Sequence, residues 1–247
     1  MPGGRPRSFD VDDALDRAVE AFWRHGYEGA SLQVLTGAMG INKTSMYAAF
    51  GRKEELFHRA VARYAEIDMA YARQALDEPT AHDVVSALLR DNTEALTQPG
   101  RPPGCLSIQG GASCGPDNAG VCEFLAASRL AGERALADRL ARAVDEGDLP
   151  ATADPAALAR FVMIFAEGQA VHAAAGVPRE QLRQAAAIAL TAFDNATART
   201  DPQEVGGGAP PSVAPRTQPR WAGHLVRPDR IVAGGEAWSE PDGRVEG

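Results

Sequence analysis

The sequence predicts an all-α protein, with a small N-terminal three-helix module and a larger helical domain. Aromatic residues make up only 6% of the 247 residues while alanine is abundant, a balance that favours packed helices over sheets. Apolar residues recur every three or four positions in successive segments, which is the spacing of a helix with one buried face. Glycine, proline and capping residues separate these segments.

The first predicted helix runs from Asp10 to about His25. Asp10 is a suitable N-cap residue, and Gly26 stands where a helix can end in the left-handed conformation. One face of this helix carries Leu15, Val19, Phe22 and Trp23. We expect that face to pack against the two short helices that follow.

Those two short helices lie between Ser31 and Phe50. Ser31 is an N-cap candidate, Gly40 falls where the first helix must end, and Asn42 caps the second. Two helices joined by a glycine-containing turn of this length form a helix-turn-helix. The second helix of that motif fits the major groove of DNA.

The charge pattern supports a nucleic-acid surface at this place. No Asp or Glu occurs from Ser31 to Lys53, whereas eight acidic and eight basic residues share the first 60 positions. The net charge of −8 arises after residue 60. Such a balance argues against non-specific coating of nucleic acid but is compatible with a focused DNA-reading surface.

The N-terminal quarter of the chain resembles the TetR family of bacterial transcriptional regulators. The residues that carry the resemblance are Phe22, His25-Gly26-Tyr27-Glu28-Gly29-Ala30-Ser31, Ala38-Met39-Gly40-Ile41 and Tyr47-Ala48-Ala49-Phe50-Gly51-Arg52-Lys53-Glu54-Glu55-Leu56-Phe57. The resemblance implies a ligand-responsive regulator, usually a repressor, that binds a palindromic operator as a homodimer. The expected partners are double-stranded DNA, a second copy of the chain and an unknown small-molecule effector, with no membrane.

Within the helix-turn-helix we expect DNA contacts at the start of the second helix. Lys43, Thr44 and Ser45 are placed to reach base edges or phosphates there, next to Asn42. Met46 and Phe50 are expected in the core. The family resemblance implies that Tyr47 donates its hydroxyl to a phosphate, with a core tyrosine as the alternative.

Four further basic or hydroxyl residues flank this helix. Lys53 begins the next helix, where a helix dipole and a positive charge both favour phosphate, and Ser31 acts either as a cap alone or also as a phosphate ligand. Arg5 and Arg7 belong to a flexible basic arm at 1–9 that either enters a minor groove or remains solvated. Ala48 and Ala49 depart from the larger polar residues frequent in the family, so specificity is expected to depend on Lys43, Thr44, Ser45 and DNA shape.

The rest of the chain is read as a helical effector-binding and dimerisation domain at 52–198, after a DNA-binding domain at 10–51. Predicted helices span 52–76, 80–96, 118–146, 154–175 and 178–193, with one or two helical turns within 105–115. Thr80 and Asp154 are the predicted caps of the helices that they begin. From 199 to 247 the sequence is rich in Gly and Pro and is predicted to be a disordered tail.

The last two predicted helices are apolar over a wide arc, wider than one partner helix covers. Such a surplus indicates an interface, with a purely structural core as the alternative. In the resembled family the last two helices form a four-helix bundle between subunits. The expected dimer interface contains Phe161, Phe165, Leu182, Ile188 and Phe193.

The resemblance also implies an effector pocket between about 60 and 198. Its candidate lining residues are Cys105, Gln109, Phe124, Met163, Glu167 and His172. Glu167 and His172 are preferred because they form a polar pair within an apolar helix. No cofactor or metal ion is expected.

Three cysteines, Cys105, Cys114 and Cys122, raise a second hypothesis. They fall within eighteen residues, so a thiol sensor for oxidants or a soft metal is an alternative to packing, although no C-x-x-C spacing occurs. The odd number and the absence of a secretory signal favour a reducing, cytoplasmic location. A helical dimer that binds a protein partner without DNA is a third hypothesis.

One sequence pattern suggests an enzyme. Residues 111–115 satisfy G-x-S-x-G, but a nucleophile elbow needs a preceding buried strand within an alternating β/α chain, and the neighbouring segments are Pro/Gly-rich or helical. No Walker A, H-E-x-x-H or dinucleotide fingerprint occurs. We therefore predict no catalytic function.

Overall fold

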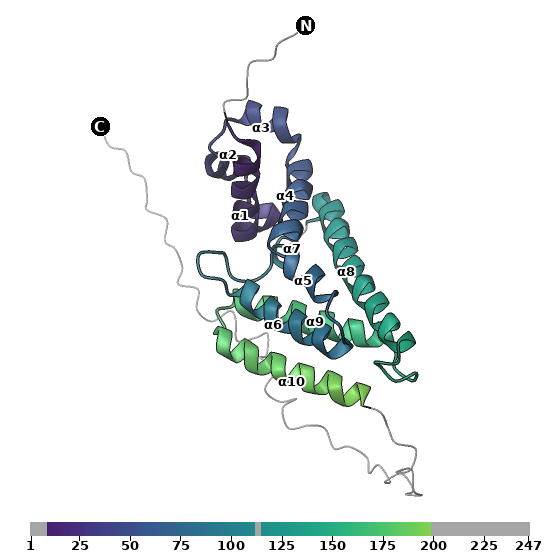
Figure 1. The fold of residues 1–247 in the computed structure, drawn as a ribbon. Coiled ribbons are helices and arrows are strands. Elements are labelled where there is room, and N and C mark those ends of the chain that lie inside the picture. Colours follow the sequence, from purple (N-terminus) through teal and green to yellow (C-terminus); the bar gives the residue numbers. More distant parts are fainter. Residues whose placement is uncertain (1–8, 112–114, 199–247) are drawn as a thin grey trace, which may run out of the picture. The chain divides into compact units, whose positions relative to one another are not determined.

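The computed structural model describes residues 9–111 and 115–198, and every regular element in these ranges is helical (Figure 1). The all-α prediction is therefore confirmed. The elements are α1 (Val11–Gly29), α2 (Leu32–Met39), α3 (Lys43–Phe50), α4 (Lys53–Ile67), α5 (Ala70–Ala75), α6 (Ala81–Leu96), α7 (Leu106–Gln109), the 3-10 turn η1 (Pro116–Asn118), α8 (Ala119–Asp145), α9 (Pro155–Ala174) and α10 (Arg179–Thr197).

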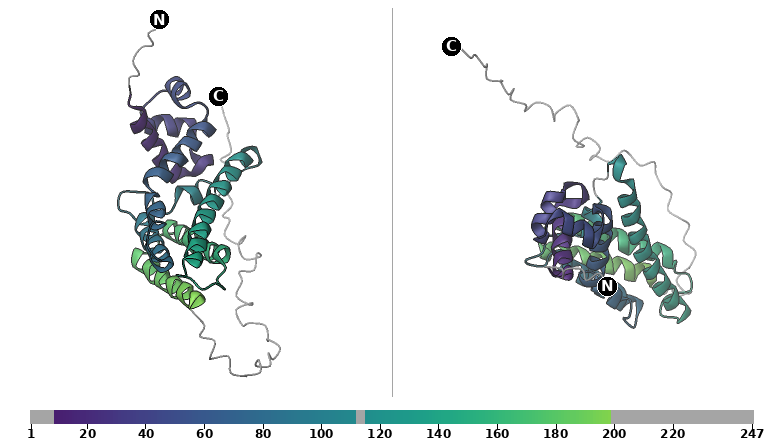
Figure 2. Two further views of the ribbon diagram at one scale, coloured as in Figure 1. Left: turned by 45° about the vertical axis from the view of Figure 1, so that its right-hand side comes forward. Right: turned by 90° about the horizontal axis from the view of Figure 1, so that it is seen from above.

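Helices α1, α2 and α3 gather around the first turns of α4 (Figures 1 and 2). Asp10 caps α1 as predicted, by accepting hydrogen bonds from the backbone N–H groups of Asp12 and Asp13. Gly26 has φ +65° and interrupts α1, although one further turn continues to Gly29. The predicted stop at Gly26 is thus a kink, because a left-handed residue redirects the chain without preventing another turn.

The core of this module is aromatic. Phe22 and Phe57 are fully buried with their ring centres 4.9 Å apart, and Arg63 of α4 forms an ion pair with Asp16 of α1 at 2.9 Å. The same apolar cluster continues into Leu106 of α7 and Leu125 of α8. The N-terminal module therefore shares its core with helices of the larger domain.

The predicted single helix at 52–76 is wrong, because the chain breaks at Asp68 and Met69 between α4 and α5. Asp68 is largely buried and pairs with Arg101 at 2.7 Å, while burial raises its pKa against the opposing effect of Arg101. No Gly or Pro marks the break in the sequence. A tertiary ion pair, rather than local propensity, accompanies the end of α4.

The larger domain packs α8 and α10 against α6 and α9. Its own apolar cluster contains Leu136, Leu140 and Phe193, each with no more than 1% of its surface exposed. The predicted caps at Thr80 and Asp154 are confirmed, since each side chain accepts a hydrogen bond from the first turn of its helix.

A buried polar network crosses this domain. The Tyr71 hydroxyl donates to Asn92 Oδ1 (2.8 Å), Asn92 Nδ2 donates to Gln169 Oε1 (2.9 Å), and Gln169 Nε2 donates to Thr93 Oγ1 (2.7 Å). Buried amides are costly without partners, so this network fixes how α5, α6 and α9 meet.

The predicted arm at 1–9 falls outside the described residues except for Phe9, and the predicted tail at 199–247 lies entirely outside them. Both remain predictions, as do the domain boundaries. Within the described ranges, no helix combines the length and the apolar character that crossing a bilayer requires.

Candidate nucleic-acid interface and cavity

The two short helices are held by the caps that the sequence predicted. The Val34 N–H donates to Ser31 Oγ (3.2 Å), and the Ser45 N–H donates to Asn42 Oδ1 (2.8 Å). Gly40 ends α2 in the left-handed region with φ +69°. These three residues fix the turn between α2 and α3 and hence the exposure of α3.

Helix α3 separates its side chains into a buried and an exposed face. Met46 and Phe50 are buried, as expected. Lys43, Thr44 and Ala48 are exposed, and Ser45 is partly buried. Tyr47 exposes 40% of its surface, so it is not a core tyrosine. The exposed face consists of side chains that can contact phosphates or base edges.

Two lysines stand beside aromatic rings on this surface. The Lys43 ammonium lies 5.8 Å from the centre of the Tyr47 ring, one helical turn away. The Lys53 ammonium lies 4.4 Å from the centre of the Tyr27 ring. Burial lowers the pKa of Lys53, and the charge of Glu28 opposes that shift. Lys53 is therefore partly buried against Tyr27, whereas Lys43 is exposed and lies near the outer limit of a cation–π contact.

The structure describes one of the three remaining flanking residues that were predicted to bind DNA. Ser31 is exposed while it caps α2, so its two predicted roles are compatible. Arg5 and Arg7 lie outside the described residues. Arg52, a base of the acid-free segment that was not predicted to bind DNA, is exposed directly before α4 and next to Lys53. Its position after the left-handed Gly51 is the signal that could have identified it.

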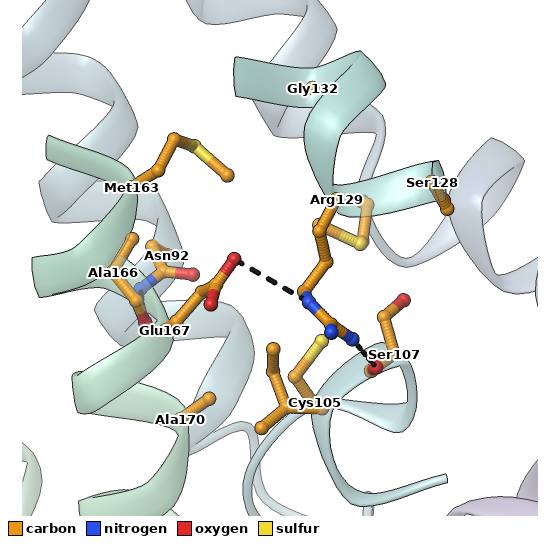
Figure 3. Close-up of a pocket in the computed structure, with 12 residues that line it drawn as sticks. Asn92, Cys105, Ser107, Ser128, Arg129, Gly132, Met163, Ala166, Glu167 and Ala170 are labelled. Atoms are coloured by element: carbon orange, nitrogen blue, oxygen red, sulfur yellow. Dashed lines mark hydrogen bonds and ion pairs between the residues drawn. The ribbon is translucent and has the colours of Figure 1, made fainter. Parts of the chain in front are cut away.

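A cavity of about 100 Å³ lies between α7, α8 and α9, with contributions from α6 and from Met69 (Figure 3). Most of its surface is apolar. Its lining consists of Met69, Asn92, Cys105, Ser107, Ile108, Ser128, Arg129, Gly132, Met163, Ala166, Glu167 and Ala170. This size suits a small ligand, below the usual range for drug-sized molecules.

The polar end of the cavity is formed by Arg129 and Glu167, which face each other in Figure 3. Their closest atoms, Arg129 Nε and Glu167 Oε1, are 3.9 Å apart, and Arg129 also donates to the Ser107 carbonyl at 3.3 Å. Burial raises the pKa of Glu167, and Arg129 partly offsets that shift. The loose ion pair leaves hydrogen-bonding capacity for a ligand.

Three of the six predicted effector residues line this cavity: Cys105, Met163 and Glu167. Gln109 lies beside the end of α1, Phe124 stacks on His58 with 4.1 Å between ring centres, and His172 is exposed. His172 follows Glu167 by five positions, a rotation of about 140° around a helix, so the two side chains cannot face one site.

Sequence reasoning missed Met69, Asn92, Ser107 and Arg129. They come from separate segments that only the tertiary fold brings together. Of these four, only Arg129 could have been recognised in the sequence. It follows Leu125 by one helical turn, so it is a charged residue on the buried stripe of α8. The other three carry no pattern that distinguishes them from ordinary packing residues.

The cysteines occupy different states. Cys105 is a free, buried thiol, and it hydrogen-bonds with Tyr64, whose pKa burial raises well above its usual value. Cys122 is disulfide-bonded, which the odd cysteine count did not predict. Cys114, like Ser113 of the G-x-S-x-G run, lies outside the described residues. In the described part of the chain, no group of three His, Cys, Asp or Glu side chains could hold a metal ion.

The predicted dimer residues divide between surface and core. Phe161 and Ile188 are exposed by 39% and 72%, and Phe165 is partly buried. Leu182 and Phe193 are buried inside the chain by their own neighbours. Ile164 and Val171, which the sequence did not single out, expose 65% and 56% and share the α9 stripe with Phe161.

Two family models match the chain over most of its described length. The model described as "Bacterial regulatory proteins, tetR family" matches residues 14–60, and "Tetracyclin repressor-like, C-terminal domain" matches residues 81–197. The matches fall on the helix-turn-helix module and on the helices that enclose the cavity.

Individual proteins agree with these models. The chain is 33% identical over 191 residues to the HTH-type transcriptional repressor ComR of Escherichia coli K12, a match that covers 76% of this chain and 90% of ComR. A structure of a cysteine mutant of the TetR family regulator CifR, complexed with 26-bp double-strand operator DNA, is 42% identical with a TM-score of 0.74. The match covers 76% of this chain and 99% of the CifR chain. A TetR regulator from Rhodococcus sp. RHA1 is 41% identical with a TM-score of 0.51, covering 73% and 97%.

Proposed function

The chain belongs to the TetR family and is a DNA-binding transcriptional regulator, and from this premise we propose that it is a repressor released by a small molecule. It binds a palindromic operator as a homodimer through α3 and its flanks. The supporting observation is the exposed row of Lys43, Thr44 and Tyr47 on a capped helix without acidic residues. The structure of the similar regulator CifR in complex with operator DNA supports operator binding.

Homodimer formation is supported by α9 and α10. Phe161, Ile164 and Val171 form one exposed apolar stripe on α9, and Ile188 is the most exposed large apolar residue in the described part of the chain. A two-fold dimer places two recognition helices on successive major grooves of one duplex face, which is why a palindrome is proposed.

The cavity supports a small, largely apolar effector with one polar group. Its apolar wall is formed by Ile108, Met163 and Ala166, and its polar end by Arg129 and Glu167. A ligand that engages this pair acts on α8 and α9 together. Release of DNA then follows by linkage if the ligand-bound arrangement holds the operator less tightly.

The operator interface is tested by Lys43→Ala. An operator is first selected from random duplexes, and its affinity is then measured across a salt series. We expect K43A to weaken binding by about tenfold and, if Lys43 contacts a phosphate, to reduce the salt dependence by about one counterion. The control R90A removes an exposed charge from α6 and leaves both values unchanged.

Unchanged affinity of K43A at every salt concentration, with the dimer intact, contradicts the proposed contact of Lys43 with the operator, whereas a wild-type protein that selects no duplex favours a helical partner-binding protein. The effector is tested separately. Small apolar molecules are screened for release of labelled operator, and Met163→Trp, which fills the cavity, should abolish release without weakening DNA binding.

Thiol sensing is the second candidate, because the free Cys105 thiol lines the cavity while Cys122 is disulfide-bonded. An oxidant or soft metal would then replace the small-molecule effector. Alkylation of each cysteine with and without operator tests this candidate. Uniformly inert thiols, and an operator affinity unaffected by reductant, exclude it.

A further inference from the structure

Helices α7 and α8 join the cavity to the DNA-binding module by a route separate from α4. Cys105, Ser107 and Ile108, at the start of α7 and within it, line the cavity, and the Gly110 carbonyl just after α7 accepts a hydrogen bond from the Tyr27 N–H (3.2 Å). Because Gly26 is left-handed, the chain turns there and presents Tyr27 and Glu28 to the larger domain.

Glu28 is the acidic residue at this junction. Its Oε1 atom accepts hydrogen bonds from Asn118 Nδ2 (2.6 Å), directly before α8, and from the Gly115 N–H (3.2 Å), directly before η1. These two bonds, that from Asn118 first, hold the pKa of Glu28 below its usual value. The side chain is therefore an ionised acceptor at neutral pH.

Lys53 at the start of α4 contacts Tyr27, the residue next to Glu28. The Lys53 ammonium rests 4.4 Å from the centre of the Tyr27 ring and also interacts with the charge of Glu28. Lys53 is a proposed phosphate ligand of the operator interface. Tyr27 and Glu28 are thus neighbouring residues that both contact the larger domain, and the Tyr27 ring also contacts this proposed phosphate ligand.

The opposite end of this route is the polar end of the cavity. Asn118 stands at the N-terminus of α8, and Arg129 on the same helix pairs with Glu167 and donates to the Ser107 carbonyl (Figure 3). A ligand that separates Arg129 from Glu167 or Ser107 would shift α8 against α7 and α9. An α-helix transmits such a shift along its axis to Asn118.

We propose that Glu28 is a positioning residue through which α8 sets the position of Lys53. Occupancy of the cavity and affinity for the operator are then coupled by this route as well as through α4. The inference rests on the proposed function, because it assumes that the module binds an operator. It names the contact through which the two sites are coupled, which is that of Glu28 with Asn118 and Gly115.

Coupling between two sites is reciprocal, so it can be tested without knowing the effector. Site-resolved alkylation of Cys105 by N-ethylmaleimide, read by peptide mass spectrometry without reductant, reports on the cavity. In the full-length wild-type protein we expect saturating operator to change the Cys105 alkylation rate by about fivefold or more. This measurement reads the cavity while the operator occupies the distant face.

Three variants then distinguish a positioning role of Glu28 from a role in stability alone. E28A and N118A remove opposite sides of the contact and should each reduce the operator-induced change to less than about twofold, and the double variant should do no more. E20A is the matched control, since Glu20 lies on the same helix and forms an exposed ion pair with Arg24. It should behave as wild type, and thermal unfolding confirms that each variant is folded.

Two results overturn the role of Glu28. The first is an operator-induced change in the Cys105 alkylation rate that is as large in E28A and N118A as in wild type. The second is a wild-type protein that binds operator without any change in that rate. If E28A does not fold, N118A decides the question from the other side of the contact. A wild-type protein that binds no duplex from a random pool contradicts the proposed function itself. That outcome is distinct from a DNA-binding protein in which transmission fails.

Discussion

At the scale of single residues, two tyrosines show how surroundings decide the use of one side chain. Tyr27 is 7% exposed and its ring packs against Phe22 and Phe57. Tyr47 is 40% exposed beside Lys43 on α3. The first contributes to the core and the second offers a hydroxyl to solvent or to a phosphate.

Tyr47→Phe should therefore affect binding without affecting folding. Loss of one hydroxyl donor to a charged phosphate is expected to weaken operator affinity by about tenfold, whereas the free energy of unfolding should change by less than about 0.5 kcal/mol. Fluorescence anisotropy with labelled operator and urea unfolding measure the two quantities.

Tyr71→Phe is the complementary control for this prediction. It removes a buried donor to Asn92 and should lower the free energy of unfolding by about 1–3 kcal/mol, with operator affinity per folded dimer retained. Equal operator affinity of Y47F and wild type would contradict the phosphate contact of Tyr47.

At the scale of helices, short elements depend on their ends more than long ones. Helices α2 and α3 have eight residues each, so a capped first turn is a large part of each helix. Asn42 caps α3 and stands beside the residues predicted to face DNA. A substitution there acts on folding, on DNA binding or on both, according to its chemistry.

Two substitutions of Asn42 separate these effects. N42A loses the cap and should lower the free energy of unfolding by about 1 kcal/mol. N42D keeps the cap, so its stability should equal that of wild type, but its charge next to phosphates should weaken operator binding by about tenfold at low salt. A salt series that leaves the N42D defect unchanged would contradict the proposed location of the DNA backbone.

A pH-dependent contact joins α6 to α10. His82 Nδ1 lies 2.8 Å from Asp194 Oδ1, and this hydrogen bond raises the pKa of His82 above 6.5. Because the folded-state pKa is raised, the stabilisation is fully present below the unfolded value and is lost as pH rises through the folded value. The exposed pair limits the effect to about 1 kcal/mol or less.

H82Q should therefore unfold at a lower temperature than wild type at about pH 5.5, and the difference should vanish by about pH 8.5. Thermal unfolding followed by circular dichroism at both pH values measures the difference. A gap that widens with rising pH would contradict the assignment of the stabilisation to protonated His82.

At the scale of the whole molecule, apolar side chains remain exposed after one chain has folded. Ile164, Val171 and Ile188 expose 65%, 56% and 72% of their surface on the last two helices. Exposed apolar residues gathered on adjacent helices usually mark an interface. The proposed repressor needs that interface, because a single recognition helix of eight residues reads few base pairs.

Ile188→Glu should dissociate the dimer without unfolding the subunit. Sedimentation analysis is expected to give a monomer whose circular dichroism equals that of wild type, with operator affinity reduced by about a hundredfold or more. The control I67E places the same charge at another exposed apolar position, on α4, and should remain dimeric. Dimeric I188E would place the interface on a different surface.

Much of the fold could be predicted because its signals are local. The caps at Asp10, Ser31, Asn42, Thr80 and Asp154 needed only a residue type beside an apolar period. The exposed face of α3 could be predicted for the same reason, since Met46 and Phe50 define its buried side. The break at Asp68 could not, because its partner Arg101 is distant in sequence.

Patterns along the chain were enough to predict most of the helices, their caps, the helix-turn-helix without acidic residues, and the family that the family models confirm. The packing of the helices in space was needed to show that Arg129 faces Glu167 at the cavity, that Leu182 is buried while Ile188 is exposed, and that Glu28 contacts Asn118. Local structure follows from neighbours along the chain, which the sequence states directly. Cavities, interfaces and couplings follow from neighbours in space. When a helix is apolar over a wide arc, its sequence does not show which side packs into the core of its own subunit.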